Sequence, residues 1–391
     1  MPFMLTASVY PFDDQELNPQ ESMDPYKSCW CGSGKKWKWC HKNREQQTPI
    51  PFVKLLSDMF AVAREGICLH PNAPDQCSDK IIRAHTVQRN GGLSKIAENS
   101  HVLSLKDGIL KQASKDFVLE PVLVGLRSAS TFMGFCDRHD GAMFRPVEHG
   151  NIDLNYETAF LLSFRAVAYE MFAKLAAERW SEVQRECDRG LPFSQQVRAQ
   201  SIIHWTLLGT RKAIQDIGQW KFEYDKAYNE RDYSRFHYAA VMFDEILPFA
   251  VCGGVVPEFG FDGQKLQYIG RRALKLEHIA FNVSVIEGRT VGVFGWLGED
   301  NGFSRRFAES FLQLPEIEMA DALLRFAFEH VENLFLKPSW WQSVSAKTQN
   351  NLLKRIKNGT ISTDRTADCL LPEGDRLFDI FPSRIANHIN S

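Results

Sequence analysis

The stretch CWCGSGKKWKWCH, residues 29–41, decides how the chain around it folds, because it holds four ligands for one metal ion. Two cysteines one residue apart are followed, after eight intervening residues, by an adjacent Cys-His pair. Three thiolates and one imidazole can close a tetrahedron around a structural Zn²⁺. Gly32 and Gly34 allow a tight turn beneath the metal, because glycine adopts positive φ without a Cβ clash. The predicted ligands are Cys29, Cys31, Cys40 and His41.

With its CGSGKK core, this stretch resembles the SEC-C metal-binding motif, the small zinc module found at the C-terminus of SecA and in many otherwise unrelated bacterial proteins. A closed shell of three cysteines and one histidine leaves no open position for a substrate. The resemblance implies docking on a protein or ribosomal partner. We expect Trp30, Trp37 and the lysines around them to form the contact surface. The alternative is that four polar residues coincide in a loop.

The composition bounds the partners and the compartment. The 391 residues are 44% apolar with a formal net charge of −2, which predicts a sizeable core and no global attraction to nucleic acid or membrane. The nine cysteines cluster towards the N-terminus at paired spacings, which indicates metal ligation in a reducing compartment rather than disulfides. The N-terminus lacks signal-peptide features and no apolar run is long enough to span a bilayer, so we expect a cytoplasmic protein.

Changes in composition divide the chain into five parts. The predicted boundaries are 1–28 for a poorly ordered lead-in, 29–42 for the SEC-C-like zinc module, 43–51 for a linker, 52–150 for a second zinc unit and 151–391 for a body of unknown function. We predict an α+β fold class, with a predominantly helical body, a small antiparallel sheet and two zinc-bound modules, one SEC-C-like and one treble-clef-like.

Hydrophobic periodicity indicates the elements of the body. Helical spacing predicts helices over 52–63, 155–187, 195–230, 311–336 and 345–357. Alternating apolar residues on both sides of Glu287-Gly288 predict a β-hairpin. The helix over 155–187 places Arg165 and Glu170 between apolar residues, where such charges either form a buried pair or lie at a solvated edge.

A second set of cysteines and a histidine indicates another zinc site. Treble-clef sites take two ligands from an N-terminal loop and two from the start of a helix, and this chain offers that split arrangement. The predicted ligands are Cys68, Cys77, Cys136 and His139. The alternative is that Cys68 or Cys77 is a small buried apolar residue.

Between these ligands, IIRAH (residues 81–85) indicates a short strand that ends on a histidine. With Phe135-Cys-Asp-Arg-His-Asp140 and the following Phe144, these pieces resemble the HNH endonuclease family, whose core is two strands and a helix around a metal. The resemblance implies that His85 is the catalytic base, and the carboxylate of Asp140 would be a suitable ligand of Mg²⁺ or Mn²⁺. This chain departs from the family pattern because Asp140 stands where histidine is usual, and residues 127–131 offer hydroxyls in place of an asparagine.

These patterns leave two functional hypotheses. The first is a nucleic-acid-binding, metal-dependent HNH-like endonuclease acting in defence against phage or mobile DNA. The second is a non-enzymatic zinc adaptor that docks on a partner through the SEC-C-like module. Convergence of His85 and Asp140 within ~5 Å on a point open to solvent would favour the nuclease, because both groups would share one cation or water. A buried His85 bonded to a backbone carbonyl would favour the adaptor.

Overall fold

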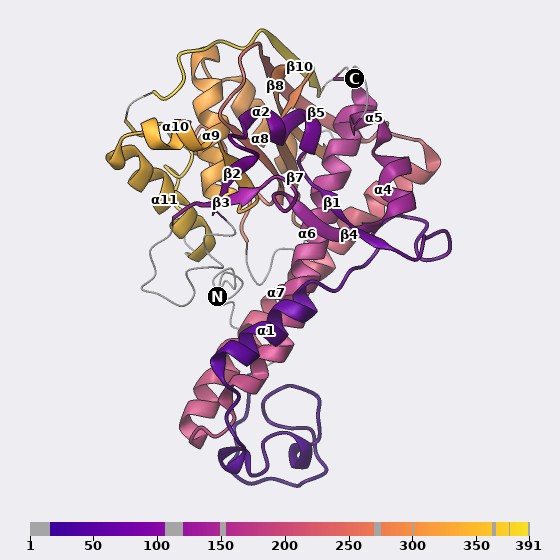
Figure 1. Ribbon diagram of the computed structural model, residues 1–391, viewed down its shortest axis with the longest axis vertical. Coiled ribbons are helices and arrows are strands. Elements are labelled where there is room, and N and C mark those ends of the chain that lie inside the picture. The colour runs from indigo at the N-terminus through magenta and orange to yellow at the C-terminus, as the bar shows by residue number, and fades with distance from the viewer. Residues whose placement is uncertain are drawn as a thin grey trace.

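The computed structural model describes residues 16–105, 120–148, 154–269, 275–298, 301–361, 365–374 and 376–389. In these ranges a large antiparallel sheet is covered by helices, and a long helical hairpin projects from it (Figure 1). The loop that carries the first cysteines lies at the far end of this hairpin (Figure 1). Residues 1–15 of the predicted lead-in lie outside the described residues.

Helices pack on both faces of the sheet. The helices are α1 Phe52–Ala63, α2 Ser94–Ile96, α4 Asp137–Met143, α5 Arg145–Glu148, α6 Tyr156–Gln184, α7 Phe193–Glu230, α8 Phe303–Leu312, α9 Met319–His330, α10 Pro338–Ser343 and α11 Ala346–Ile361. Helices α6 and α7 cover one face, whereas α8, α9 and α11 contribute to the core on the other. The predicted helices over 52–63, 155–187, 195–230 and 345–357 are confirmed, with small differences at their ends.

The main sheet has eight strands in the order β10-β5-β8-β7-β6-β9-β2-β3, and each neighbouring pair is antiparallel. Its strands are β2 His101–Ser104, β3 Val122–Gly125, β5 Phe236–Phe243, β6 Phe249–Val255, β7 Ile279–Ile286, β8 Arg289–Leu297, β9 Leu334–Leu336 and β10 Arg384–His388. The predicted hairpin around Glu287-Gly288 is confirmed as β7–β8. The prediction of a small sheet is wrong.

The size of the sheet escapes a reading of the sequence because its central strands are buried on both faces. Along β5, Tyr238 and Ala240 pack into the core beneath α6 and α7, while Ala239 and Val241 pack into the opposite core. Such a strand is a continuous apolar run without the alternation that marks a half-exposed strand. The remaining strands are short and come from distant parts of the chain, so only tertiary pairing makes them visible.

The predicted helix over 311–336 is the second correction to the fold. Helix α8 ends at Leu312, α9 begins at Met319, and residues 334–336 form strand β9 between β6 and β2. Pro315 lies in the break, where its fixed φ and missing N–H interrupt a continuous helix.

Helices α6 and α7 form the hairpin that projects from the sheet (Figure 1). Helix α6 begins with a capping box, in which the Asn155 side chain accepts from the backbone N–H of Thr158. Helix α7 has 38 residues, which corresponds to a length of ~57 Å. Helix α1 runs along α6, with Phe60 edge-on to Trp180 at 5.0 Å between ring centroids. In the described residues, no helix is long and apolar enough to cross a membrane.

His278, just before β7, makes the core sensitive to acid. Its ring is buried and stacks on Trp220 of α7 at 4.5 Å, and burial lowers its pKa to about 3. The unfolded chain therefore binds a proton below pH ~6.5 that the folded chain excludes, so stability falls as the pH falls. From pH 7.5 to pH 5 this group should cost about 2 kcal/mol.

We expect His278→Phe, which keeps a stacked ring, to remove about 2 kcal/mol from the difference in unfolding free energy between pH 7.5 and pH 5. Urea denaturation of the wild type and the variant at both pH values measures it. His101→Phe, at an exposed position in β2, serves as the control and should leave the difference unchanged. An identical pH dependence in wild type and His278→Phe would contradict the prediction.

Candidate metal centres

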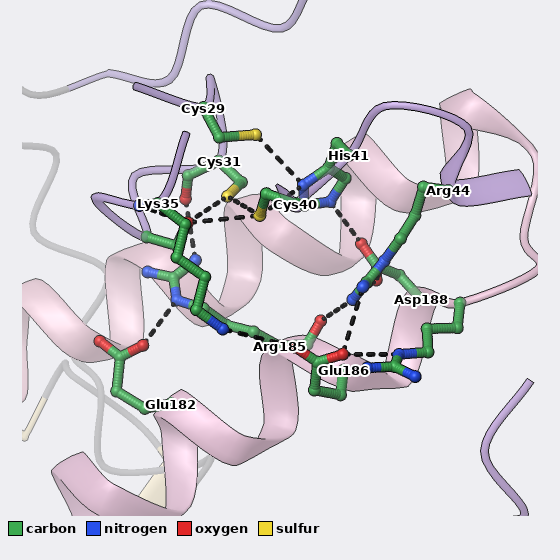
Figure 2. Close-up of polar contacts among 12 residues, drawn as sticks. Cys29, Cys31, Lys35, Cys40, His41, Arg44, Glu182, Arg185, Glu186 and Asp188 are labelled. Carbon is green, nitrogen blue, oxygen red and sulfur yellow. Dashed lines mark hydrogen bonds and ion pairs between the residues drawn. The ribbon is translucent and has the colours of Figure 1, made fainter. Parts of the chain in front are cut away.

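The first cysteine cluster, Cys29, Cys31, Cys40 and His41, is assembled as the spacing predicts. All four side chains are buried, and their ligand atoms lie within 4.8 Å of one another. The Nδ1 atom of His41 is 3.3 Å from Cys29 Sγ and 3.2 Å from Cys40 Sγ, and Cys31 Sγ is 3.6 Å from Cys40 Sγ (Figure 2). Gly32 and Gly34 have φ of 75° and 73°. Three thiols and one imidazole at these distances form a donor set that fits Zn²⁺.

Asp188 supports this cluster from 147 positions further along the chain. Its Oδ2 accepts from His41 Nε2 at 2.9 Å, which places the ring proton on Nε2 and leaves the Nδ1 lone pair facing the thiols. A carboxylate behind a ligating histidine is a usual support in zinc sites. A metal would select this neutral ring. Without one, the hydrogen bond to Asp188 and the neighbouring thiols raise the pKa of His41 against the effect of burial and favour a proton on Nδ1 as well.

Asp188 itself is fully buried and has two further partners. Arg44 contacts its carboxylate at 2.7 and 2.6 Å (Figure 2), and Gln200 donates to it at 2.8 Å. Burial opposes the charge of Asp188, yet the hydrogen bond from His41 and the charge of Arg44 hold its pKa below the ordinary value. Arg44 belongs to the predicted linker 43–51, which is therefore attached to the turn between α6 and α7.

Arg185 joins the zinc loop to the same turn. Its guanidinium donates to the backbone carbonyl of Cys31 at 2.8 Å (Figure 2) and to Gln200 at 2.9 Å. Trp30 is buried edge-on against Phe193 of α7, and Trp37 is buried as well. The expectation that Trp30 and Trp37 form a contact surface is wrong, because both rings face the core between the loop and the hairpin. Of the three tryptophans in this loop, Trp39 is the exposed one, at 69%.

The thiols of the first cluster influence one another. Hydrogen bonds from Cys29 and Cys40 lower the pKa of Cys31, and they outweigh the effect of burial. Hydrogen bonds to Cys31 and Cys40 raise the pKa of Cys29 in turn. At least one thiolate is therefore favoured before any metal arrives, which is the form that binds Zn²⁺.

The second cysteine cluster, Cys68, Cys77, Cys136 and His139, also converges within 4.8 Å. The antiparallel pair β1 Ile81–His85 and β4 Thr131–Cys136 is followed directly by α4, which places Cys136 at the N-cap and His139 in the first turn. His139 Nδ1 is 3.3 Å from Cys68 Sγ and 3.7 Å from Cys77 Sγ. The cluster is less buried than the first, and this donor set also fits Zn²⁺.

Backbone N–H groups lower the pKa of one thiol in the second cluster, which favours the thiolate form that binds metal. Burial alone would raise the pKa of Cys136, but backbone N–H groups of His139 and Ser78 lower it to about 7. Burial and the hydrogen bond to Cys68 raise the pKa of the Cys77 thiol to about 12. Behind the cluster, the His70 ring stacks on His139 at 3.8 Å and fixes the plane of the ligand.

His85 ends strand β1, as the sequence predicts, and is half-buried. Its Nε2 lies 3.3 Å from the backbone carbonyl oxygen of Leu126. A carbonyl can only accept, so Nε2 carries the proton and Nδ1 keeps its lone pair. Burial lowers the pKa of His85, which keeps the ring neutral. The carbonyl contact that we expected of a structural histidine therefore also suits a base.

Asp140 lies in α4, is 7% exposed, and its Oδ1 has no hydrogen-bond partner among the described residues. The charges of Arg165 and Glu148 influence the pKa values of both Asp140 and His85, and Arg165 and Glu148 contact each other. Burial raises the pKa of Asp140 to about 6, against the charge of Arg165. In the described part of the chain, His85 and Asp140 belong to neither of the two groups whose ligand atoms lie within 4.8 Å.

Arg165 of α6 forms a buried ion pair with Glu148. It is 1% exposed, contacts Glu148 at 2.7 Å and lies 3.9 Å from the centre of the Phe144 ring. Its Nε and Nη1 atoms have no hydrogen-bond partner among the described residues. Of the two alternatives for Arg165, the buried ion pair is the one observed, with Glu148 as its partner.

Sequence reasoning missed three supporting residues. Asp188 and Gln200 had no signal, because nothing local links them to a loop about 150 residues earlier. For Glu148, the signal was the charge of Arg165 on an apolar helix, which requires an anionic partner when buried.

Comparison with family models, with curated proteins and with solved structures finds no match to this chain.

Proposed function

We propose that the protein is a metal-dependent, HNH-like endonuclease with two structural zinc sites, acting on phage or mobile DNA in the cytoplasm. His85 is the general base and Asp140 a ligand of a divalent cation, Mg²⁺ or Mn²⁺. The observation that supports the proposal is Asp140, a buried carboxylate whose Oδ1 has no hydrogen-bond partner among the described residues. The carbonyl contact of His85 by itself counts towards the adaptor. His85 Nε2 lies 3.3 Å from the carbonyl oxygen of Leu126, so Nδ1 is the ring nitrogen that would take a proton, and burial keeps the ring neutral by lowering its pKa.

In the proposed reaction, His85 Nδ1 takes a proton from a water molecule as the water oxygen bonds to the phosphorus. The bond from phosphorus to the leaving sugar oxygen breaks, and that oxygen takes a proton from solvent. A divalent cation supplies charge stabilisation on the phosphate. Mg²⁺ commonly binds through one or two carboxylates while keeping several waters, so Asp140 alone can anchor it. Arg165 orients Glu148 through their ion pair.

The hydrogen bonds around residue 86 hold His85 in place. Thr86 donates its backbone N–H to Ser130 O at 2.8 Å, and Asn333 donates its side-chain amide to Thr86 Oγ1 at 2.8 Å. Ser130 in turn accepts from Val87 N at 2.8 Å. A base fixed by its neighbours is already oriented when substrate arrives, which is what general-base catalysis requires.

The test is cleavage of plasmid DNA and of RNA by zinc-loaded protein with Mg²⁺ or Mn²⁺. We expect His85→Ala to lower the cleavage rate by about 10²- to 10⁴-fold, the usual contribution of a general base. His101→Ala removes an exposed histidine of β2 and should leave the rate unchanged. Activity that survives His85→Ala would remove His85 from the mechanism.

A zinc adaptor without catalytic activity is the second candidate, and a separate observation favours it. The first cluster is closed, buried and held against the hairpin turn by Asp188 and Arg185, far from the sheet (Figure 1). Such a rigid zinc loop suits presentation to a partner. Zinc-loaded protein that cleaves neither DNA nor RNA with either cation would favour this function over the nuclease.

A further inference from the structure

The surface of the zinc loop carries two exposed aromatic rings with lysines between them. We call Tyr26, Lys36, Lys38 and Trp39 the tip patch. Tyr26 is 66% exposed and Trp39 is 69% exposed. Lys38 Nζ lies 4.1 Å from the centre of the Tyr26 ring and 4.5 Å from that of Trp39, and Lys36 also lies over both rings. Exposed rings that lie next to each other form a patch, and patches mark interaction sites more often than single exposed rings do.

The charge around the tip patch is strongly positive, although the whole chain has a net charge of −2. The lysines within residues 24–42 are Lys27, Lys35, Lys36, Lys38 and Lys42. The single acidic residue in this range is Asp24, whose carboxylate accepts from the backbone N–H of Tyr26. Lys35 forms an ion pair with Glu186 at 3.7 Å, and the other lysines remain as a local source of positive potential.

The tip patch is preorganised by the metal-site scaffold. The two segments that carry it are joined by backbone hydrogen bonds, from Trp37 N to Lys27 O at 2.9 Å and from Lys38 N to Pro25 O at 3.1 Å. The loop beneath is fastened to the hairpin turn through Arg185 and Asp188. A ligand would therefore meet rings that are already in position, and little ordering entropy would be lost on binding.

We propose that the tip patch binds single-stranded nucleic acid, with bases stacking on Tyr26 and Trp39 and the lysines contacting the phosphates. Alternating rings and cations match a polymer that alternates flat bases with negative charges. An acidic protein surface needs only the lysines, whereas a single strand uses the lysines and both rings along its whole length. This inference adds a nucleic-acid-binding surface to the proposed nuclease, and it can hold even if the nuclease proposal fails.

The tip patch and the residues around His85 lie towards opposite ends of α6, so their roles can be tested separately. Arg165, which contacts Glu148, and Gln184, next to the turn, are 19 residues apart on one helix, a distance of ~29 Å. A substitution in the tip patch therefore leaves the geometry around His85 unchanged. Binding can be measured without Mg²⁺ or Mn²⁺, so the result does not depend on cleavage.

The test is fluorescence anisotropy of labelled 20-mer oligo-dT and oligo-U with the zinc-loaded full chain. We expect Trp39→Ala to weaken binding by about 5- to 150-fold, the range that loss of one base–aromatic stack produces. Tyr268→Ala is the matched control, because Tyr268 is 73% exposed, has Lys265 over its ring at 4.1 Å, and lies outside the zinc loop. It should leave the affinity unchanged.

Two further arms keep the proposal falsifiable. Two zinc ions per chain in Trp39→Ala would establish that the loop is intact, and Tyr26→Ala should weaken binding in the same direction. Polyglutamate, which has charge without bases, should compete at least about 10-fold more weakly than unlabelled oligo-dT. Equal competition would assign the tip patch to an acidic protein partner and overturn the proposal. Equal affinity of the wild type and Trp39→Ala, or no binding by the wild type, would also overturn it.

Discussion

Asp188→Ala should detach the zinc loop from the helical hairpin and weaken the first metal site. The substitution leaves Arg44 buried without its main counter-charge, and breaking a buried pair in this way costs about 3–5 kcal/mol. It also removes the acceptor that holds the His41 tautomer, and loss of such support lowers metal affinity by about 10- to 100-fold. Urea denaturation measures the first effect, and zinc competition against a chelator measures the second.

Two variants sharpen this prediction. Asp188→Asn keeps the acceptor for His41 but removes the charge, so it should fall between the wild type and Asp188→Ala in both measurements. Glu178→Ala is the control, because it breaks the exposed contact with Arg211 at 2.7 Å and should cost less than about 1 kcal/mol with no loss of zinc. An Asp188→Ala protein as stable as Glu178→Ala, with unchanged zinc affinity, would contradict the role of Asp188.

Cys136→Ser should abolish the second zinc site and loosen the unit that carries His85. Cys136 ends β4 and caps α4, and the metal bound there would join these elements to the loop of Cys68 and Cys77. Binding of zinc by such a site is coupled to folding, so loss of a ligand costs both. We expect one zinc per chain instead of two, and faster proteolysis between residues 68 and 136. Metal analysis and limited proteolysis measure these outcomes.

Cys369→Ala is the control for Cys136→Ser. Burial raises the pKa of the Cys369 thiol to about 12, so it is protonated and a poor ligand, and it lies outside both clusters. This variant should keep two zinc ions and a protease-resistant second unit. Two zinc ions in Cys136→Ser would show that Cys136 is not a ligand.

The two clusters differ in how far their sequence predicts them. Cys29 and His41 are 12 positions apart, so local spacing and two glycines are enough to bring the four ligands together. Cys68 and His139 are 71 positions apart. Their convergence was still predictable, because a strand pair followed by a helix is a recurrent way to build such a site. In both cases the donor types themselves carried the prediction.

The role of the first cluster was less predictable than its ligands. Trp30 and Trp37 look the same as Trp39 in the sequence, yet the hairpin turn buries the first two and leaves the third in solvent. The choice depends on Phe193 and the residues around Asp188, which no local pattern connects to the loop. A local prediction of a contact surface therefore named the wrong side of the module.

The sequence by itself determined which cysteines and histidines form the two candidate metal clusters, the strand that ends at His85 and most of the helices, because spacing and periodicity are local properties. Only the tertiary structure decided the eight-stranded sheet, the partner of Arg165 and the carboxylate behind His41. These depend on burial on both faces of a strand and on charges that must find partners once they leave water. Asp188 is the clearest example, since its buried charge links a metal loop to a helical hairpin 147 residues away.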